Sequence, residues 1–177
     1  PLGILAAVTI LSLVFPSIPS VIISEGVNSG DTAWMLVASA LVLIMTPGLA
    51  YFYGGMVNTK NVISTMLQSF IAMGVISIIW VVVGYSLAFG ESIGGFVGNP
   101  MSHFMFKGVL DAKPWGTIPA IVFAFFQLKF AVITPALVTG SLAERINFKS
   151  YVVFMVLFSL LIYAPLAHMT WAPGGFL

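Results

Sequence analysis

The sequence has 177 residues, of which 60% are hydrophobic and only 6% are charged, and its mean hydropathy is +1.12. About a quarter of the residues in a soluble domain are normally charged, so the composition argues against a soluble enzyme, a nucleic-acid-binding protein and a disordered tail. The net charge of +1 creates no field for polyanions, and the absence of cysteine excludes disulfides, thiolate metal sites and a cysteine nucleophile. What remains is an integral membrane protein.

Residues 1–24 form an apolar segment whose role the sequence leaves open. The run from Leu2 to Phe15 would be only ~21 Å long as a helix, and Pro16 and Pro19 then interrupt it. That length suits the core of a signal peptide, although a clear cleavage site and a basic start are both missing. We expect either a signal peptide or a ragged N-terminal membrane segment, followed by a membrane domain over 25–177.

Four later stretches are long enough to cross a bilayer as helices, because a span needs roughly 20 mostly apolar residues. In chain order these stretches are 33–54, 62–88, 118–141 and 151–171, and the third contains Lys129. Strands of a membrane barrel would alternate apolar and polar residues, whereas these stretches are apolar all round. The sequence therefore predicts an all-α integral membrane protein.

The orientation in the membrane follows from the positive charges in the loops. Lys60, Arg145 and Lys149 fall on one side of the expected spans, and Lys107 and Lys113 fall on the other. We expect the turns that carry Lys60 and Arg145 in the cytoplasm. Asp31 and the loop over 90–117 are then outside.

The third expected span carries a pair of aromatic residues, Phe126 and Phe130, that share one helix face because they are four positions apart. The two rings could face lipid or the protein core. They could also form a stacked constriction across a narrow pathway and contact a cation through their π faces. Spacing alone does not choose between these interpretations.

Lys129 lies near the middle of the same span, away from the centre of the Phe126 and Phe130 stripe. A lysine at that depth must pair, lose its proton or extend to the membrane surface. We consider a structural or subunit-interface role and a role in tuning or blocking a pathway.

The first and fourth spans contribute further aromatic residues near their ends. Phe52 and Tyr53 follow Pro47 and could form an aromatic belt at the membrane interface. Trp171 could be a belt residue or the lip of a pore, and His168 a proton relay or a hydrogen-bonded residue at the helix end. The expected spans contain no carboxylate, so metal cages and ion-pair relays have no support, and nucleotide-binding loops and Ser-His-Asp motifs are absent.

Several motifs together resemble the ammonium transporter and Rhesus-protein family of channels, over roughly residues 29–177. The matching residues are Asp31–Trp34 (DTAW), Pro47–Gly55 (PGLAYFYGG) with Lys60 and Asn61, Gly84–Gly90 (GYSLAFG), Phe126–Gln127, Phe130–Ala131, Ile133–Leu137 (ITPAL), Gly140, Ala143–Arg145 (AER) and Tyr163–Trp171 (YAPLAHMTW). Their number and order make chance similarity improbable.

The resemblance implies a fold and a set of site residues. The fold is that of an eleven-helix transporter with two inverted halves, of which this chain supplies the N-terminal four transmembrane helices. Phe126 and Phe130 match the stacked phenylalanine gate, and Trp171 matches the tryptophan of the outer ammonium-recruiting site. Phe52 and Tyr53 match aromatic residues toward the inner end of the pore. His168 is not one of the family's twin pore histidines, which we expect beyond Leu177.

The resemblance also implies ammonium transport, in which the cation is recruited outside, deprotonated and passed through a hydrophobic pore. The alternative is a membrane ammonium sensor with a C-terminal signalling module. We expect a multi-pass protein of the plasma membrane (a bacterial or archaeal inner membrane) that forms a homotrimer and can bind a cytoplasmic regulatory protein at its inner mouth. We expect no enzymatic activity, no cofactor, no metal and no nucleic acid. Lys129 departs from the small or apolar residue expected at its position, which makes it a possible modulator of conduction.

Overall fold

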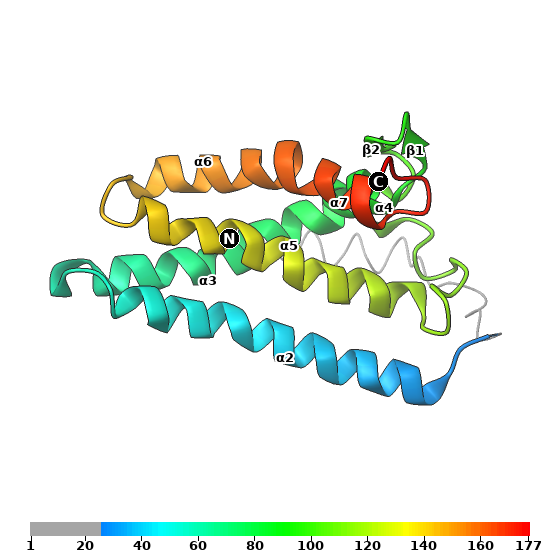
Figure 1. Ribbon diagram of the computed structural model, residues 1–177, viewed down its shortest axis with the longest axis horizontal. Coiled ribbons are helices and arrows are strands. Elements are labelled where there is room, and N and C mark those ends of the chain that lie inside the picture. Colours follow the sequence, from blue (N-terminus) through cyan, green and yellow to red (C-terminus); the bar gives the residue numbers. More distant parts are fainter. Residues whose placement is uncertain (1–25) are drawn as a thin grey trace, which may run out of the picture.

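A computed structural model of the chain describes residues 26–177 (Figure 1), so the signal peptide or extra segment expected over 1–24 lies outside the described residues. In that range, four helices are long and apolar enough to cross a membrane. They are Ser29–Gly54, Thr59–Phe89, Ala120–Leu142 and Phe148–Trp171. The expected class, an all-α membrane protein, is confirmed.

The first span is the single helix α2 (Ser29–Gly54), which begins at a side-chain cap. The side-chain oxygen of Asn28 accepts hydrogen bonds from the backbone amides of Gly30 (2.8 Å) and Asp31 (3.1 Å). These amides belong to the first turn and have no partner within the helix, so the cap stabilises the start of α2. Pro47 lies inside α2 and does not end it.

Two of the spans are not uniform α-helices. The second span consists of η1 (Thr59–Asn61), α3 (Val62–Ile79), η2 (Trp80–Gly84) and α4 (Tyr85–Phe89), and the fourth of α6 (Phe148–Phe158), η4 (Ser159–Tyr163) and α7 (Ala164–Trp171). Both η2 and η4 are single π-helical turns, which are rare and occur mostly inside α-helices. Trp80 of η2 and Tyr163 of η4 lie with their ring centroids 6.3 Å apart, so the two wide turns face each other.

The spans lie side by side, and α5 (Ala120–Leu142) runs in the same direction as α2, while the second and fourth spans return (Figure 1). Short connections join α2 to α3 and α5 to α6 at one end, which we call the turn end. The opposite end, which we call the loop end, carries most of the residues between α4 and α5. The positive charges in the loops predict that the turn end lies in the cytoplasm.

The loop end contains local structure that the sequence did not predict. Strand β1 (Ser92–Ile93) pairs antiparallel with β2 (Val97–Gly98), and a 3-10 turn, η3 (Phe104–Phe106), follows. A side chain at Gly98 is impossible without rearrangement, since its Cβ would lie 2.2 Å from the carbonyl oxygen of Ser86. This close approach holds the hairpin against the end of α4.

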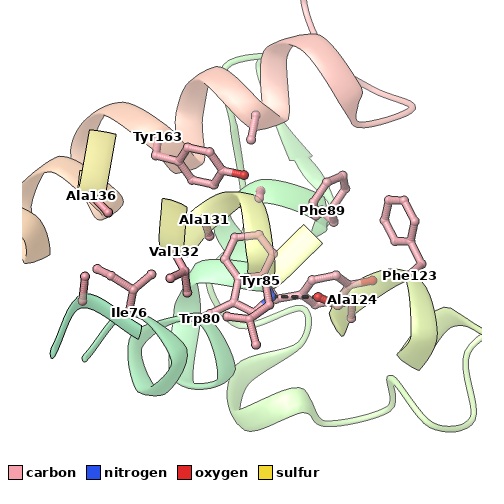
Figure 2. Close-up of a cluster of buried hydrophobic side chains, with 14 of the residues drawn as sticks. Ile76, Trp80, Tyr85, Phe89, Phe123, Ala124, Ala131, Val132, Ala136 and Tyr163 are labelled. Atoms are coloured by element: carbon pink, nitrogen blue, oxygen red, sulfur yellow. Dashed lines mark hydrogen bonds between the residues drawn. The ribbon is translucent and has the colours of Figure 1, made fainter. Parts of the chain in front are cut away.

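The core near the loop end is built from large aromatic rings supplied by the second, third and fourth spans (Figure 2). Trp80 is fully buried, and its indole N–H donates a 3.1 Å hydrogen bond to the carbonyl oxygen of Ala124 in α5. Phe89 packs edge-on against Phe123, with ring centroids 5.0 Å apart. Small residues of α5 such as Ala131 and Ala136 are also fully buried and allow neighbouring helices to approach closely.

Candidate permeation site

Three aromatic residues of the expected pore form one continuous series in the structure. The rings of Phe126 and Phe130 on α5 lie 5.1 Å apart at 71°, and Phe130 lies 6.5 Å from Trp171 at 63°. Both angles are edge-to-face arrangements, which aromatic pairs favour over direct stacking. The series thus runs from the end of α7 onto α5, and we call it the ring column.

The ring column is open on one side. Phe126 and Phe130 are half-buried, and the side chain of Trp171 is 49% exposed. Within the described residues, the three rings therefore form one partly exposed aromatic face.

Local structure explains how α5 presents its two phenylalanines. They occupy positions i and i+4 of an uninterrupted helix, which places one ring above the other. The hydroxyl of Thr134 donates to the carbonyl oxygen of Phe130 at 2.7 Å, next to Pro135, which has no amide proton of its own. Side-chain bonds of this kind and a neighbouring proline both bend helices.

Trp171 is positioned by a hydrogen-bonded turn that follows α7. The amide of Ala172 donates to the carbonyl oxygen of His168 at 3.2 Å, and the amide of Leu177 donates to that of Met169 at 2.9 Å. The amide of Phe176 also donates to the carbonyl oxygen of Gly95 at 2.9 Å, which ties this turn to the β1–β2 hairpin. The indole of Trp171 therefore projects from a braced end of the helix.

His168 is a structural anchor in this chain. Its ring is fully buried, with Nδ1 3.0 Å from the carbonyl oxygen of Ala88 and Nε2 2.9 Å from Oγ of Ser92. Because a carbonyl oxygen only accepts, Nδ1 carries a proton and donates to Ala88. Both ring nitrogens are thus engaged in joining α7 to α4 and β1. Of the two sequence interpretations, the structure favours the hydrogen-bonded histidine.

Phe52 and Tyr53 lie apart from the ring column, further toward the turn end. Their rings are 5.4 Å apart, and Phe52 is 61% exposed. The hydroxyl of Tyr53 donates to the carbonyl oxygen of Leu137 at 2.8 Å, a contact about 10 Å along α5 from Phe130. A Cβ at Gly140 would lie 2.5 Å from the Tyr53 ring, so this glycine makes room for the tyrosine between α2 and α5.

Lys129 is adjacent to the ring column without belonging to it. Its ammonium lies 5.7 Å from the centroid of the Phe125 ring, one turn earlier on α5, in cation–π range. The side chain is half-buried. The structure thus places the charge of Lys129 next to Phe125 and not within the ring column.

Further residues shape the surroundings of the ring column. Gln127 follows Phe126, is buried, and its side-chain oxygen has no hydrogen-bond partner among the described residues, although buried polar atoms are normally paired. The sequence does not predict the wide turns at Trp80 and Tyr163, because a π-helical turn leaves no mark in an apolar run. Within residues 26–177 no group of three or more His, Asp or Glu could hold a metal ion.

The fold and the ring column define a class, a multi-span helical membrane protein with an aromatic wall between its helices. The family model of the ammonium transporter family matches residues 33–177, and the chain belongs to that family. The chain is 46% identical over 165 residues to an ammonium transporter of Mycobacterium tuberculosis, an alignment that covers 84% of the chain and 35% of that relative. An ammonium transporter of Aquifex aeolicus is 46% identical over 151 residues, or 85% of the chain and 36% of the relative.

Solved structures agree with this assignment. Mep2 of Candida albicans, as its N240A mutant, superposes with a TM-score of 0.79 at 33% identity, over 86% of this chain and 34% of that one. A protein described as a sensor Amt protein matches with a TM-score of 0.72 at 26% identity, over 79% and 33% of the two chains. The chain spans about a third of the length of the curated relatives it matches.

Proposed function

We propose that the complete protein conducts ammonium or ammonia across the plasma membrane, a bacterial or archaeal inner membrane. The observation that carries this proposal is the ring column, in which Phe126, Phe130 and Trp171 are in contact and partly exposed. Membership of the ammonium transporter family supplies the substrate. The family is one of transporters, and moving a cation in this way requires no covalent step and no cofactor.

Desolvation explains how such a wall can select its substrate. Transferring a bare ion of this size from water to dry protein costs on the order of 20 kcal/mol in the idealised limit. A potassium ion cannot reduce this cost inside an apolar pore. Ammonium can, because it donates hydrogen bonds and can leave its proton behind, so that neutral ammonia crosses.

Each residue of the proposed site has a distinct role in this scheme. Trp171 offers its exposed π face to the incoming cation, and Phe126 with Phe130 forms the gate below it. Phe52 and Tyr53 line the inner end. Lys129 modulates the entry of ammonium, because its own positive charge near the gate repels the incoming cation.

The family resemblance further supports a homotrimer with one pathway in each subunit. It also supports a cytoplasmic regulatory protein that closes the inner mouth, at the turn end. Both remain proposals for this protein, and its direct partners are ammonium or ammonia and the lipid bilayer.

Transport assays on single-ring variants test the proposed roles. We expect Trp171→Ala to lower uptake most at low ammonium concentration, and Phe130→Ala to reduce discrimination against potassium. Phe70→Ala is a matched control, since Phe70 is an exposed phenylalanine on α3 outside the ring column. Unchanged flux and selectivity in both test variants would contradict the proposal.

The alternative function is that of an ammonium sensor, and the similarity to a protein described as a sensor Amt protein supports it. Liposomes that contain the purified protein distinguish the two. A transporter acidifies or alkalinises the lumen when an ammonium gradient is applied, whereas a protein that only senses binds ammonium without such a change. Loss of the flux in Trp171→Ala ties the activity to the ring column.

A further inference from the structure

The hydroxyl of Ser92 is the point at which three segments of the loop end meet. It donates a 2.8 Å hydrogen bond to the carbonyl oxygen of Gly174, in the turn that follows α7. It accepts a 3.1 Å hydrogen bond from the backbone amide of Gly95 in its own hairpin, and Nε2 of His168 on α7 lies 2.9 Å away. One side chain of β1 therefore joins α7, the turn beyond it and the hairpin.

These contacts hold the chain on both sides of Trp171. His168 precedes the tryptophan by three residues and Gly174 follows it by three. Trp171 itself contacts Phe130 of the ring column, with 6.5 Å between the ring centroids. Because the direction of a side chain follows from the backbone that carries it, the segment that Ser92 holds decides where the indole points.

The packing around this junction is close. A Cβ at Gly174 would lie 2.8 Å from the Cβ of Ser92, so a glycine is needed for the turn to come this near to β1. The rings of Phe96 and Phe176 stack with their centroids 5.2 Å apart at 15° and join the hairpin to the turn at a second point. The hydrogen bonds of Ser92 therefore lie in a fixed frame.

The Ser92 hydroxyl has only one proton for two acceptors. Nδ1 of His168 donates to the carbonyl oxygen of Ala88, so in a neutral ring Nε2 is an acceptor. Nε2 and the carbonyl oxygen of Gly174 then share the single proton of Ser92. A residue without a hydroxyl at this position would loosen both attachments at once, to α7 and to the turn.

We propose that Ser92 is a positioning residue for the outer ammonium site, because it fixes the backbone around Trp171 and thereby the indole that receives the cation. The inference rests on the proposed function, in which ammonium first meets Trp171. Ser92 carries neither a charge nor an aromatic ring, so it does not attract the cation as the indole does. Its effect on transport therefore acts through Trp171.

Fluorine NMR of the complete protein labelled with fluorotryptophan tests the positioning directly. The resonance of Trp171 is assigned by its loss in Trp171→Phe. We expect one sharp Trp171 resonance in the wild-type protein and in Ser92→Thr, which keeps the hydroxyl, and a shifted or broadened one in Ser92→Ala. Ser92 lies at an exposed position, so Ser92→Ala should fold, and an unchanged resonance of the buried Trp80 verifies this.

Ser102→Ala is the matched control for this measurement. The Ser102 hydroxyl accepts a 3.1 Å hydrogen bond from the backbone amide of Glu91, one residue before Ser92, and should leave the Trp171 resonance unchanged when removed. An unchanged Trp171 resonance in Ser92→Ala would overturn the proposal, whatever the protein transports.

Uptake kinetics test whether the positioning matters for ammonium. We expect Ser92→Ala to raise the ammonium concentration for half-maximal uptake by about fivefold, the effect of one typical hydrogen bond, with the maximal rate unchanged. In a Trp171→Ala background the same substitution should have no further effect, since no indole remains to be positioned. Equal effects in both backgrounds would overturn the proposal. If Trp171→Ala leaves uptake unchanged while the resonance moves in Ser92→Ala, the proposed function fails and the positioning of the indole by Ser92 stands.

Discussion

His168 and Trp171 lie one turn apart on α7 and meet opposite environments. His168 is fully buried and uses both ring nitrogens, whereas Trp171 is 49% exposed at the end of the ring column. The first residue holds α7 against α4 and β1, and the second lies in contact with Phe130. The histidine in this membrane helix is therefore a packing residue, and the role proposed for Trp171 depends on its exposed indole ring.

Replacing His168 tests its anchoring role. His168→Ala removes two hydrogen bonds and leaves a cavity, so we expect a loss of about 3 kcal/mol in the free energy of unfolding. Denaturant titration in micelles measures the change. His103→Ala is the control, because Nδ1 of that ring is 3.4 Å from its acceptor and the side chain is only half-buried. Equal losses in the two variants would contradict the anchoring role.

At the scale of the elements, one carboxylate joins the two connections at the turn end. Glu144 follows α5 with a left-handed φ of 63° and accepts hydrogen bonds from the backbone amide of Asn58 (2.8 Å) and the side-chain amide of Asn61 (2.9 Å). The hydrogen bond from the Asn61 side chain, followed by that from the Asn58 backbone, lowers the pKa of Glu144 below its usual value. The turn after α2 is thus bound to the turn after α5.

This contact predicts a pH dependence with a definite sign. Because the pKa of Glu144 is lowered by the fold, its stabilisation is present above the ordinary pKa of a glutamate and disappears as the pH falls through the lowered value. Amide exchange at Asn58, compared at equal pH in the wild-type protein and in Glu144→Ala, measures it. We expect faster exchange in the variant at pH 7, and the difference between the two proteins should shrink as the pH falls through the lowered pKa. The Ser150 amide, bonded to Asn147, serves as an internal control.

At the scale of the whole molecule, the two ends differ in how they are held together. The loop end carries the β1–β2 hairpin (Figure 1) and the aromatic core. The turn end carries the hydrogen bonds to Glu144 and the hydrogen bond from Tyr53 to Leu137. Both connections at the turn end lie on the same side of the spans. The orientation expected from the positive charges places that side in the cytoplasm.

Cysteine labelling tests the orientation, since this chain has no cysteine of its own. Thr59→Cys and Asn147→Cys should both resist a membrane-impermeant maleimide in intact cells, and Met101→Cys at the loop end should react. After the cells are permeabilised, all three introduced cysteines should react with the maleimide. Reaction of the first two from outside would reverse the orientation while leaving the helix arrangement unchanged.

Much of the fold and part of the site could be predicted from the sequence. Span positions follow from long apolar runs, and the shared face of Phe126 and Phe130 follows from helical spacing. The π-helical turns at Trp80 and Tyr163 could not be predicted, because a wide turn depends on the packing of two distant helices. The role of His168 depended on Ala88 and Ser92, which are far away in the sequence.

The sequence by itself determined the membrane class and the number of spans over 26–177, since the cost of burying charge in lipid is a local, additive property of each segment. Its motifs also pointed to the family. Only the tertiary structure decided that Trp171 completes a column with Phe130 while Phe52 and Tyr53 form a separate pair. Contacts of that kind depend on how helices pack against one another, which the periodicity of a single helix does not contain.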